Sequence, residues 1–196
     1  MPQSDYRVAM LPPPGNIVAP RGFPADPRPA GAPQLFLDAM DVRLKVFCDE
    51  QKCALEPELD EDDPRSVHWV VYYTGGPGPE QPVSVIRIVP PPHGPHPNGF
   101  HDPHEEPYVK LGRVATMPEF RRRGLTRMLS EAAFRWLVAN REQVGGGWKD
   151  LVLTHAQVDV EKMYGRMGFV TDDKLGRWDE EGIEHLGMWK RLDAVP

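Results

Sequence analysis

The chain has 196 residues, 40% hydrophobic and 27% charged, which is ordinary for one globular domain with a sizeable core. Its 23 basic and 29 acidic residues give a net charge of −6, so we expect no nucleic-acid partner. No apolar run approaches the about 20 residues that span a bilayer, no signal-like n-region and h-region begin the chain, and only Cys48 and Cys53 are present. We therefore expect a reduced, cytoplasmic protein with no membrane partner.

Proline is unusually abundant and unevenly placed. Of 23 prolines, nine lie in residues 1–33 and ten in residues 75–107. Proline fixes φ and lacks an N–H group, so such stretches resist helices and central strands. We interpret them as loops or insertions, at about 12–33 and 75–107, on a single domain covering 1–196.

The first half of the chain predicts three strands and one helix. Residues 6–11 (YRVAML) have strand composition, and apolar residues at helical spacing predict a helix over 34–51. Residues 56–63 (EPELDEDD) are mostly acidic and predict a solvated loop. Residues 68–73 and 83–89 are rich in β-formers and predict an antiparallel hairpin.

The second half alternates strands with amphipathic helices. A strand is predicted over 108–116, with Gly112 as a possible bulge, and a long helix begins near Leu125. The remaining expectations are a strand at 151–154, a helix at 160–167 closed by Gly168, and closing strands at 169–170 and 184–192. Together these elements predict an α+β (mixed α/β) fold.

Chemistry is concentrated in residues 114–126 (VATMPEFRRRGLT). A strand leads through a Pro-containing turn into three arginines, a glycine and a long helix. Residues 110–127 hold six basic side chains and one acidic side chain, Glu119. A helix N-terminus with a glycine and fixed positive charge suits an anionic ligand. A solvated basic helix start explains the same residues equally well.

These residues resemble a known family. Arg121–Thr126 (RRRGLT) is similar to the acetyl-CoA pyrophosphate loop R/Q-x-x-G-x-G/A of the GNAT N-acetyltransferases, except that Thr126 replaces Gly or Ala. Gln157 and the segment Tyr164–Phe169 (YGRMGF) resemble the family's later strand–helix segment, which ends in Y-x-x-x-G-F. Further segments resemble the ElaA-like subfamily, namely residues 43–53, 60–63, His68 and 179–188.

The resemblance implies a splayed, mostly antiparallel sheet of about six to seven strands with helices on both faces. It implies acetyl-CoA as cosubstrate and makes a homodimer plausible. It assigns the cosubstrate to Val114, Ala115, Thr116, Arg121, Arg122, Arg123, Gly124, Leu125, Thr126 and Gln157. It also makes Tyr164 the acid that protonates the CoA thiolate, although helical spacing alone favours a core aromatic residue.

The base and the acceptor remain open. His155, Glu184, His185 and the acidic residues 60–63 are candidate bases, and His155 is equally a core histidine. The acceptor site is expected at Asp63, His68, Arg113 and His185. We predict N-acetylation of a small polar amine, with an amino sugar such as glucosamine as first candidate. The alternatives are a protein lysine or N-terminal acetyltransferase and a non-catalytic CoA-binding sensor.

Two other constellations carry less weight. His93, His96, His101 and His104 lie within twelve residues, but the intervening Gly, Pro and Asn favour a loop, so no metal is expected. Cys48 and Cys53 are five residues apart and do not form a C-x-x-C motif, which favours ordinary thiols.

Overall fold

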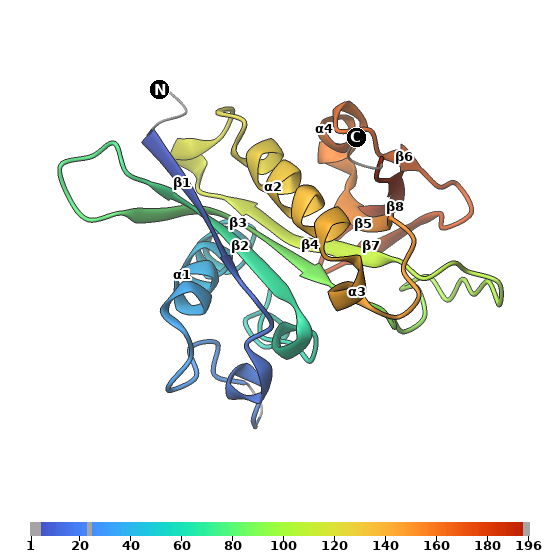
Figure 1. Cartoon of the computed structure of the whole chain (residues 1–196), viewed down its shortest axis with the longest axis horizontal. Helices are drawn as coiled ribbons and strands as arrows, with labels where there is room; N and C mark the ends of the chain where they lie inside the picture. The colour runs from blue at the N-terminus through green and yellow to red at the C-terminus, as the bar shows by residue number, and fades with distance from the viewer. Residues whose placement is uncertain (1–4, 23–24, 194–196) are drawn as a thin grey trace. The chain divides into compact units, whose positions relative to one another are not determined.

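The computed structural model describes residues 5–22 and 25–193 (Figure 1). Its strands are β1 (Tyr6–Leu11), β2 (Val67–Tyr73), β3 (Gln81–Val89), β4 (Val109–Thr116), β5 (Leu151–Gln157), β6 (Val170–Thr171), β7 (Arg177–Glu180) and β8 (Ile183–Arg191). Its α-helices are α1 (Gln34–Arg43), α2 (Leu125–Ala139), α3 (Arg141–Val144) and α4 (Glu161–Arg166). A π-helical segment, η3 (Leu44–Glu50), follows α1, and 3-10 turns form η2 (Gly15–Val18), η4 (Asp63–Arg65), η5 (Pro118–Phe120) and η6 (Val158–Val160).

The strands form one sheet in the order β1-β2-β3-β4-β5-β8-β6, and β7 pairs with β8. The described registers are antiparallel except between β4 and β5, which are parallel over three residue pairs, Val109–Leu111 with Val152–Thr154. The predicted α+β fold with a mostly antiparallel sheet is therefore confirmed. The sheet has one strand more than the six to seven expected, because the polar sequence of β7, RWDE, gave no signal from which a strand could be predicted.

The described residues form two compact units. The first contains the residues up to Val89 together with Arg113–Ala133, and the second contains Pro90–Gly112 and the residues from Phe134 onward. The prediction that both belong to a single domain stays a prediction.

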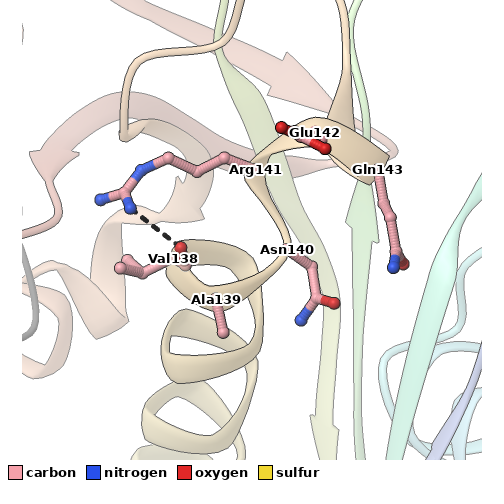
Figure 2. Close-up of a pocket in the computed structure, with 6 residues that line it drawn as sticks. All are labelled: Val138, Ala139, Asn140, Arg141, Glu142 and Gln143. Carbon is pink, nitrogen blue, oxygen red and sulfur yellow. Dashed lines mark hydrogen bonds between the residues drawn. The ribbon is translucent and has the colours of Figure 1, made fainter.

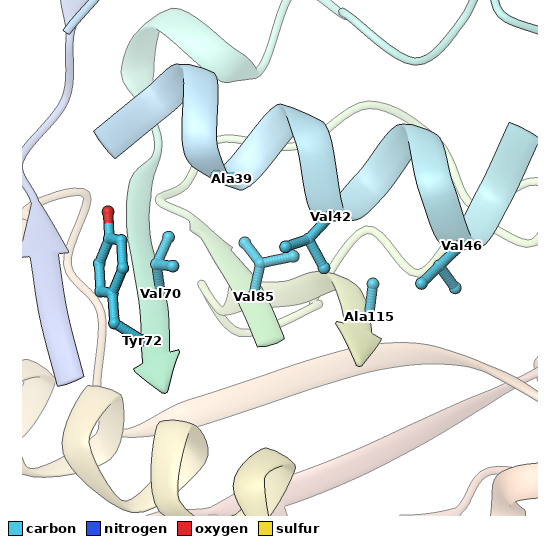
Figure 3. Packing of buried hydrophobic residues seen from close by; sticks show 7 residues of the cluster. All are labelled: Ala39, Val42, Val46, Val70, Tyr72, Val85 and Ala115. Atoms are coloured by element: carbon cyan, nitrogen blue, oxygen red, sulfur yellow. The ribbon is translucent and has the colours of Figure 1, made fainter. Parts of the chain in front are cut away.

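In the first unit, α1 packs on one face of the sheet. Ala39, Val42 and Val46 project from the helical segment and pack against valine, alanine and tyrosine side chains of the strands (Figure 3). The facing residues of the strands are Val70, Tyr72, Val85 and Ala115. The first half of α2 lies on the opposite side of these strands (Figures 1 and 3). Because both faces are covered, β2 and β3 are buried along nearly their whole length.

The predicted helix over 34–51 has two parts. Pro33 precedes α1, where its missing N–H group costs no intrahelical bond, and the α-helix runs to Arg43. The backbone then continues as η3, a π-helical segment that ends at Glu50. Such insertions are frequent at functional sites, and here the segment places Glu50 beside Arg121.

In the second unit, β5 and β8 pair along the whole of β5, from Leu151 to Gln157. Tyr108, Leu153 and Leu175 form the centre of its core. Trp178 and Trp189 pack at the edge of this cluster. His155 and Gln157 share one face of β5 with Leu153, whereas Thr154 points to the other, because strand side chains alternate.

Candidate active site

The segment between β4 and α2 has an irregular backbone. Arg122 and Gly124 adopt positive φ values of 62° and 76°. A Cβ added at Gly124 would meet nothing within 4 Å, so space is open above this peptide. Glycine is suited to this conformation and lets a ligand approach the backbone closely.

The start of α2 faces the same segment. Leu125 is buried, and the N–H of Met128 donates to the carbonyl of Gly124 at 2.9 Å to form the first turn of the helix. The N–H groups that precede Met128 have no partner within the helix, and the positive end of the helix dipole lies here. The geometry of the loop and of the helix N-terminus suits an anionic ligand.

Two of the three arginines hold the loop in place. Arg121 forms a bidentate ion pair with Glu50 at 2.8 and 2.5 Å, and its Nε donates to the Thr116 carbonyl at 3.1 Å. Hydrogen bonds from Arg121 lower the pKa of Glu50. Arg123 donates to the Glu119 carbonyl at 2.7 Å. The Arg122 side chain is exposed.

Hydroxyl groups link the end of β4 to β3 and α2. The buried Ser84 hydroxyl donates to the Ala115 carbonyl at 3.0 Å and lies 2.7 Å from Thr116 Oγ1. Thr116 Oγ1 lies 3.5 Å from the hydroxyl of Thr126. The residue that departs from the family pattern therefore orients its hydroxyl toward β4.

The acidic segment 56–63 is an irregular loop, as predicted, but it is only partly solvated: Glu56 and Glu61 are exposed, whereas two of its carboxylates are buried. Glu58 and Asp63 are 4% and 0% exposed because buried arginines from distant elements neutralise them. His68 is also fully buried, and its Nε2 lies 3.3 Å from the Asp63 carbonyl. Burial lowers the pKa of His68 to about 4, despite the opposing effect of Asp63, so the ring is neutral at neutral pH.

Arg113 lies in β4 next to this acidic segment. Its Nη2 donates to the Pro57 carbonyl at 3.0 Å and to Asp60 at 2.9 Å. Of the residues predicted to contact the acceptor, the structure therefore brings Asp63, His68 and Arg113 into one network of the first unit.

Tyr164 lies in α4 of the second unit and is 4% exposed. Its ring packs edge-on against Phe169, with the centroids 5.6 Å apart. Burial raises the pKa of Tyr164 to about 12, and the nearby Thr154 hydroxyl acts in the opposite direction. Thr154 Oγ1 is buried and makes no hydrogen bond of ordinary geometry within the described residues, so it can donate to a phenolate.

His155 lies on the face of β5 opposite to Thr154 and packs edge-on against Trp178 at 4.8 Å. Burial and then the charge of Lys110 lower the pKa of His155 to about 2. Its Nε2 is buried without a partner among the described residues. A neutral imidazole of such low basicity is a poor proton acceptor, so its chemistry is that of a hydrogen-bonding group.

The remaining candidates of the second unit lie on β8 and β5. Glu184 is exposed and forms an ion pair with Arg177 at 3.1 Å. His185 is buried, its Nδ1 lies 2.9 Å from the Ile183 carbonyl, and its ring stacks over Trp178. Gln157 is half-buried and is the register partner of His185.

The histidine-rich segment packs against the second unit's core. His96 is buried, and its Nε2 lies 2.6 Å from Glu105, while His93 Nε2 lies 2.9 Å from the Tyr108 carbonyl. Across residues 5–22 and 25–193, no three His, Cys, Asp or Glu side chains are grouped to hold a metal ion. In the same residues, no helix is long and apolar enough to cross a bilayer.

A pocket of about 330 Å³ lies at the junction of α2 and α3 (Figure 2). Six consecutive residues, Val138–Gln143, line it, and Arg141 donates to the Val138 carbonyl at 2.9 Å. None of the predicted site residues lines this pocket. It is a notch at a helix end, closed on one side by its own backbone.

Sequence reasoning missed several residues that the structure brings to the site. Glu50 and Ser84 are ordinary polar residues whose partners, Arg121 and Thr116, lie 71 and 32 positions away in sequence. Thr154 is another, and it lies near Tyr164. Arg43 and Arg87 were equally invisible as partners of the acidic segment. Each of these arginines lies in an otherwise apolar helix face or strand. That position predicts a buried acidic partner, because an unpaired buried charge is costly.

Known proteins share both the sequence pattern and the fold. The model of the acetyltransferase (GNAT) family matches residues 36–169. An acyl-CoA N-acyltransferase from Pseudomonas aeruginosa is 25% identical with a TM-score of 0.62, over 94% of this chain and 99% of that one. Escherichia coli ElaA is 21% identical with a TM-score of 0.59, over 83% and 93%. BjaI, a CoA-dependent acyl-homoserine lactone synthase solved with SAM and isopentyl-CoA, is 15% identical with a TM-score of 0.59, over 82% and 79%.

Proposed function

Because the chain belongs to the GNAT family of acetyltransferases, we propose that it transfers the acetyl group of acetyl-CoA to the primary amine of a small polar acceptor. An amino sugar such as glucosamine is the first candidate. The GNAT fold binds acyl-CoA, and we propose that the acyl group is acetyl.

The backbone between β4 and α2 carries the proposal. Open space above Gly124 and the N–H groups of the first turn of α2 suit the oxygens of a diphosphate. We assign the pyrophosphate of CoA to Arg122–Thr126, with the exposed Arg122 side chain adding positive charge. Arg121 and Arg123 act differently, because their contacts with Glu50 and Glu119 hold the loop.

The pantetheine arm is assigned to main-chain groups of Val114, Ala115 and Thr116, which would pair with it as with an added strand. The Gln157 amide is assigned a second contact with pantetheine. Both assignments use groups that can donate and accept hydrogen bonds at once, as the amides of pantetheine require.

In the proposed reaction, the neutral amine attacks the thioester carbonyl carbon and forms the C–N bond. The tetrahedral oxyanion then collapses, the C–S bond breaks, and the CoA sulfur leaves with a proton from Tyr164. With its pKa raised to about 12, Tyr164 is protonated at neutral pH and can supply that proton. A hydrogen bond from Thr154 would stabilise the phenolate that remains. Such general acids contribute about 10²–10⁴-fold in rate.

We assign the removal of the amine proton to Glu184, directly or through a water molecule. Its carboxylate and that of neighbouring Glu180 are 55% and 44% exposed and can reach a cationic or polyhydroxylated acceptor. His155 serves as a neutral hydrogen-bonding group and His185 as an acceptor contact in this assignment. Asp63 and His68 are fully buried and would support Arg113 from within the fold.

The test is thiol release from acetyl-CoA across a panel of glucosamine, spermidine, free amino acids and a lysine peptide. Turnover restricted to glucosamine supports the proposal. Turnover with the peptide alone would replace it with a protein acetyltransferase. CoA binding without turnover on any amine would favour a sensor. The proposal also includes a cytoplasmic location and a homodimer, and light scattering after size exclusion tests the dimer.

A further inference from the structure

Arg113 occupies an unusual place in β4. Its φ is +49°, in the left-handed region that a residue with a side chain rarely adopts within a strand. Gly112 precedes it, and the segment Val114–Thr116 follows at once. A residue persists in such a conformation when surrounding contacts fix it, and strained positions of this kind cluster at functional sites.

The side chain of Arg113 supplies those contacts. Its Nη2 donates to the Pro57 carbonyl at 3.0 Å and to Asp60 Oδ2 at 2.9 Å, and its Nε lies 3.7 Å from Glu58. Both hydrogen bonds come from the two N–H groups of a single nitrogen, Nη2, which therefore joins the Pro57 carbonyl and the Asp60 carboxylate.

Asp60 is itself firmly held. Arg87 donates to both of its oxygens at 2.6 and 2.9 Å. The N–H groups of Asp62 and Asp63 donate to Asp60 Oδ1 at 2.9 and 3.1 Å, which closes the turn. Three arginines, Arg43, Arg87 and Arg113, thus balance three carboxylates, Glu58, Asp60 and Asp63.

The segment after Arg113 is fixed at two further points. Ala115 is buried in the cluster beneath α1 (Figure 3), and its carbonyl accepts from Ser84. At the far end, the N–H of Met117 donates to the Val83 carbonyl at 2.9 Å. The backbone of Val114–Thr116 is therefore held at its start, its middle and its end.

We propose that Arg113 is a positioning residue that, through Asp60, fixes the backbone of Val114–Thr116 in the conformation that receives the cosubstrate. Arg113 acts at a distance and touches neither the cosubstrate nor the acceptor. This inference rests on the proposed function, because it assigns the pantetheine arm to these three residues. It replaces the expectation that Arg113 contacts the acceptor.

The test is calorimetric titration with CoA, together with the KM values for acetyl-CoA and for the amine. The variants are Arg113→Gln, Arg113→Lys, Asp60→Asn and the double variant Arg113→Gln/Asp60→Asn. Arg7→Gln is the matched control, because Arg7 is a strand arginine of the same unit with a bidentate carboxylate partner, Glu80. Melting temperatures are recorded for all variants, and titrations are run well below them.

We expect Arg113→Gln and Asp60→Asn each to raise the Kd for CoA at least about tenfold, and Arg113→Lys to give an intermediate value. The double variant should bind CoA no more weakly than the single variant with the higher Kd, since both changes break the same contact between Arg113 and Asp60. The amine KM should stay within about twofold, as should every constant of Arg7→Gln.

An unchanged Kd for CoA in Arg113→Gln, with a raised KM for the amine, would overturn the inference and return Arg113 to the acceptor site. If the effects of the two single changes on the Kd for CoA combine additively in the double variant, Arg113 does not act through Asp60. If Asp60→Asn fails to fold, Arg113→Gln decides, because it removes the contact with Asp60 and leaves the Asp60–Arg87 ion pair in place. A wild-type chain that binds no CoA would instead refute the proposed function.

Discussion

The guanidinium of Arg43 in α1 and the carboxylate of Asp63 in η4 form an ion pair at 2.7 Å in which neither side chain is exposed. Arg87 Nη1 lies 2.9 Å from the same Asp63 oxygen and forms a second ion pair with it. Burial alone would raise the pKa of Asp63, but the charges of Arg43 and Arg87 outweigh it and hold the pKa well below its usual range. This carboxylate therefore joins α1 and β3 to the segment that anchors β4.

Replacement of Asp63 by Asn should destabilise the protein strongly. Removal of one partner leaves buried guanidinium groups without their counter-charge, which costs about 3–5 kcal/mol. Urea unfolding at pH 7 measures the loss. Asp49→Asn is the control, because its ion pair with Lys45 is exposed and should contribute less than about 1 kcal/mol. Equal losses for the two variants would show that burial of the network contributes nothing.

The same carboxylate predicts a dependence on pH. Its pKa is lower in the folded chain than in the unfolded chain, so its contribution is complete above the unfolded value near 3.8 and is lost as the pH falls below it. The stability difference between wild type and Asp63→Asn should be constant from pH 5 to 7 and should shrink below about pH 4. A difference that already shrinks between pH 7 and 5 would contradict this assignment.

His155 gives a second dependence on pH, in a different range. Its pKa is about 2 in the folded chain and 6.5 in the unfolded chain, so its contribution to stability is present above pH 6.5 and declines as the pH falls. Between pH 6.5 and 4 it should give a slope of about 1.4 kcal/mol per pH unit. His155→Phe keeps a ring against Trp178. It should reduce the slope of unfolding free energy against pH by about 1.4 kcal/mol per pH unit, which corresponds to the uptake of one proton. Equal slopes in wild type and His155→Phe would contradict this account of His155.

Sequence patterns predicted much of this fold, because its main elements carry strong local signals. The valine-rich and aromatic sequence of β2 predicts a strand from 7 residues, and the helical spacing of α2 predicts a helix from 15. The burial of Glu58 and Asp63 within the acidic segment 56–63 was missed for the opposite reason. It depends on ion pairs with Arg43 and Arg87, which are distant in sequence and leave no trace in local composition.

The candidate site shows the same division. Arg121–Thr126 could be recognised because its spacing of arginine, glycine and helix start resembles a motif of the GNAT family. Thr154 could not be connected with Tyr164, since the contact depends on how α4 packs on β5. The π-helical turn that presents Glu50 to Arg121 was likewise hidden, because 34–51 has one continuous helical periodicity.

Gly124→Ala tests the pyrophosphate loop. A Cβ would meet no neighbour, so any defect arises from the φ of +76° and from the lost approach of the ligand. We expect the KM for acetyl-CoA to rise at least about fivefold, with kcat changed less than twofold, because the proposed loop contact would stabilise ground state and transition state alike. A fall in kcat with an unchanged KM would show that the glycine serves the chemical step.

Thr154→Val tests the partner of Tyr164. The two side chains have nearly the same shape, so the change removes the hydroxyl and little else. We expect kcat to fall about tenfold because the phenolate loses a donor. In a Tyr164→Phe background the same change should have no effect, since no phenolate forms. An equal effect in both backgrounds would separate Thr154 from Tyr164.

The most direct measurement compares steady-state thiol release from acetyl-CoA in wild type and Tyr164→Phe with glucosamine as acceptor. We predict turnover in wild type and a loss of about 10²–10⁴-fold in kcat in the variant, with the Kd for CoA and the melting temperature nearly unchanged. Equal kcat values would contradict the assignment of Tyr164 as the acid. Absence of turnover in wild type with every amine of the panel, despite bound CoA, would contradict the acetyltransferase activity itself.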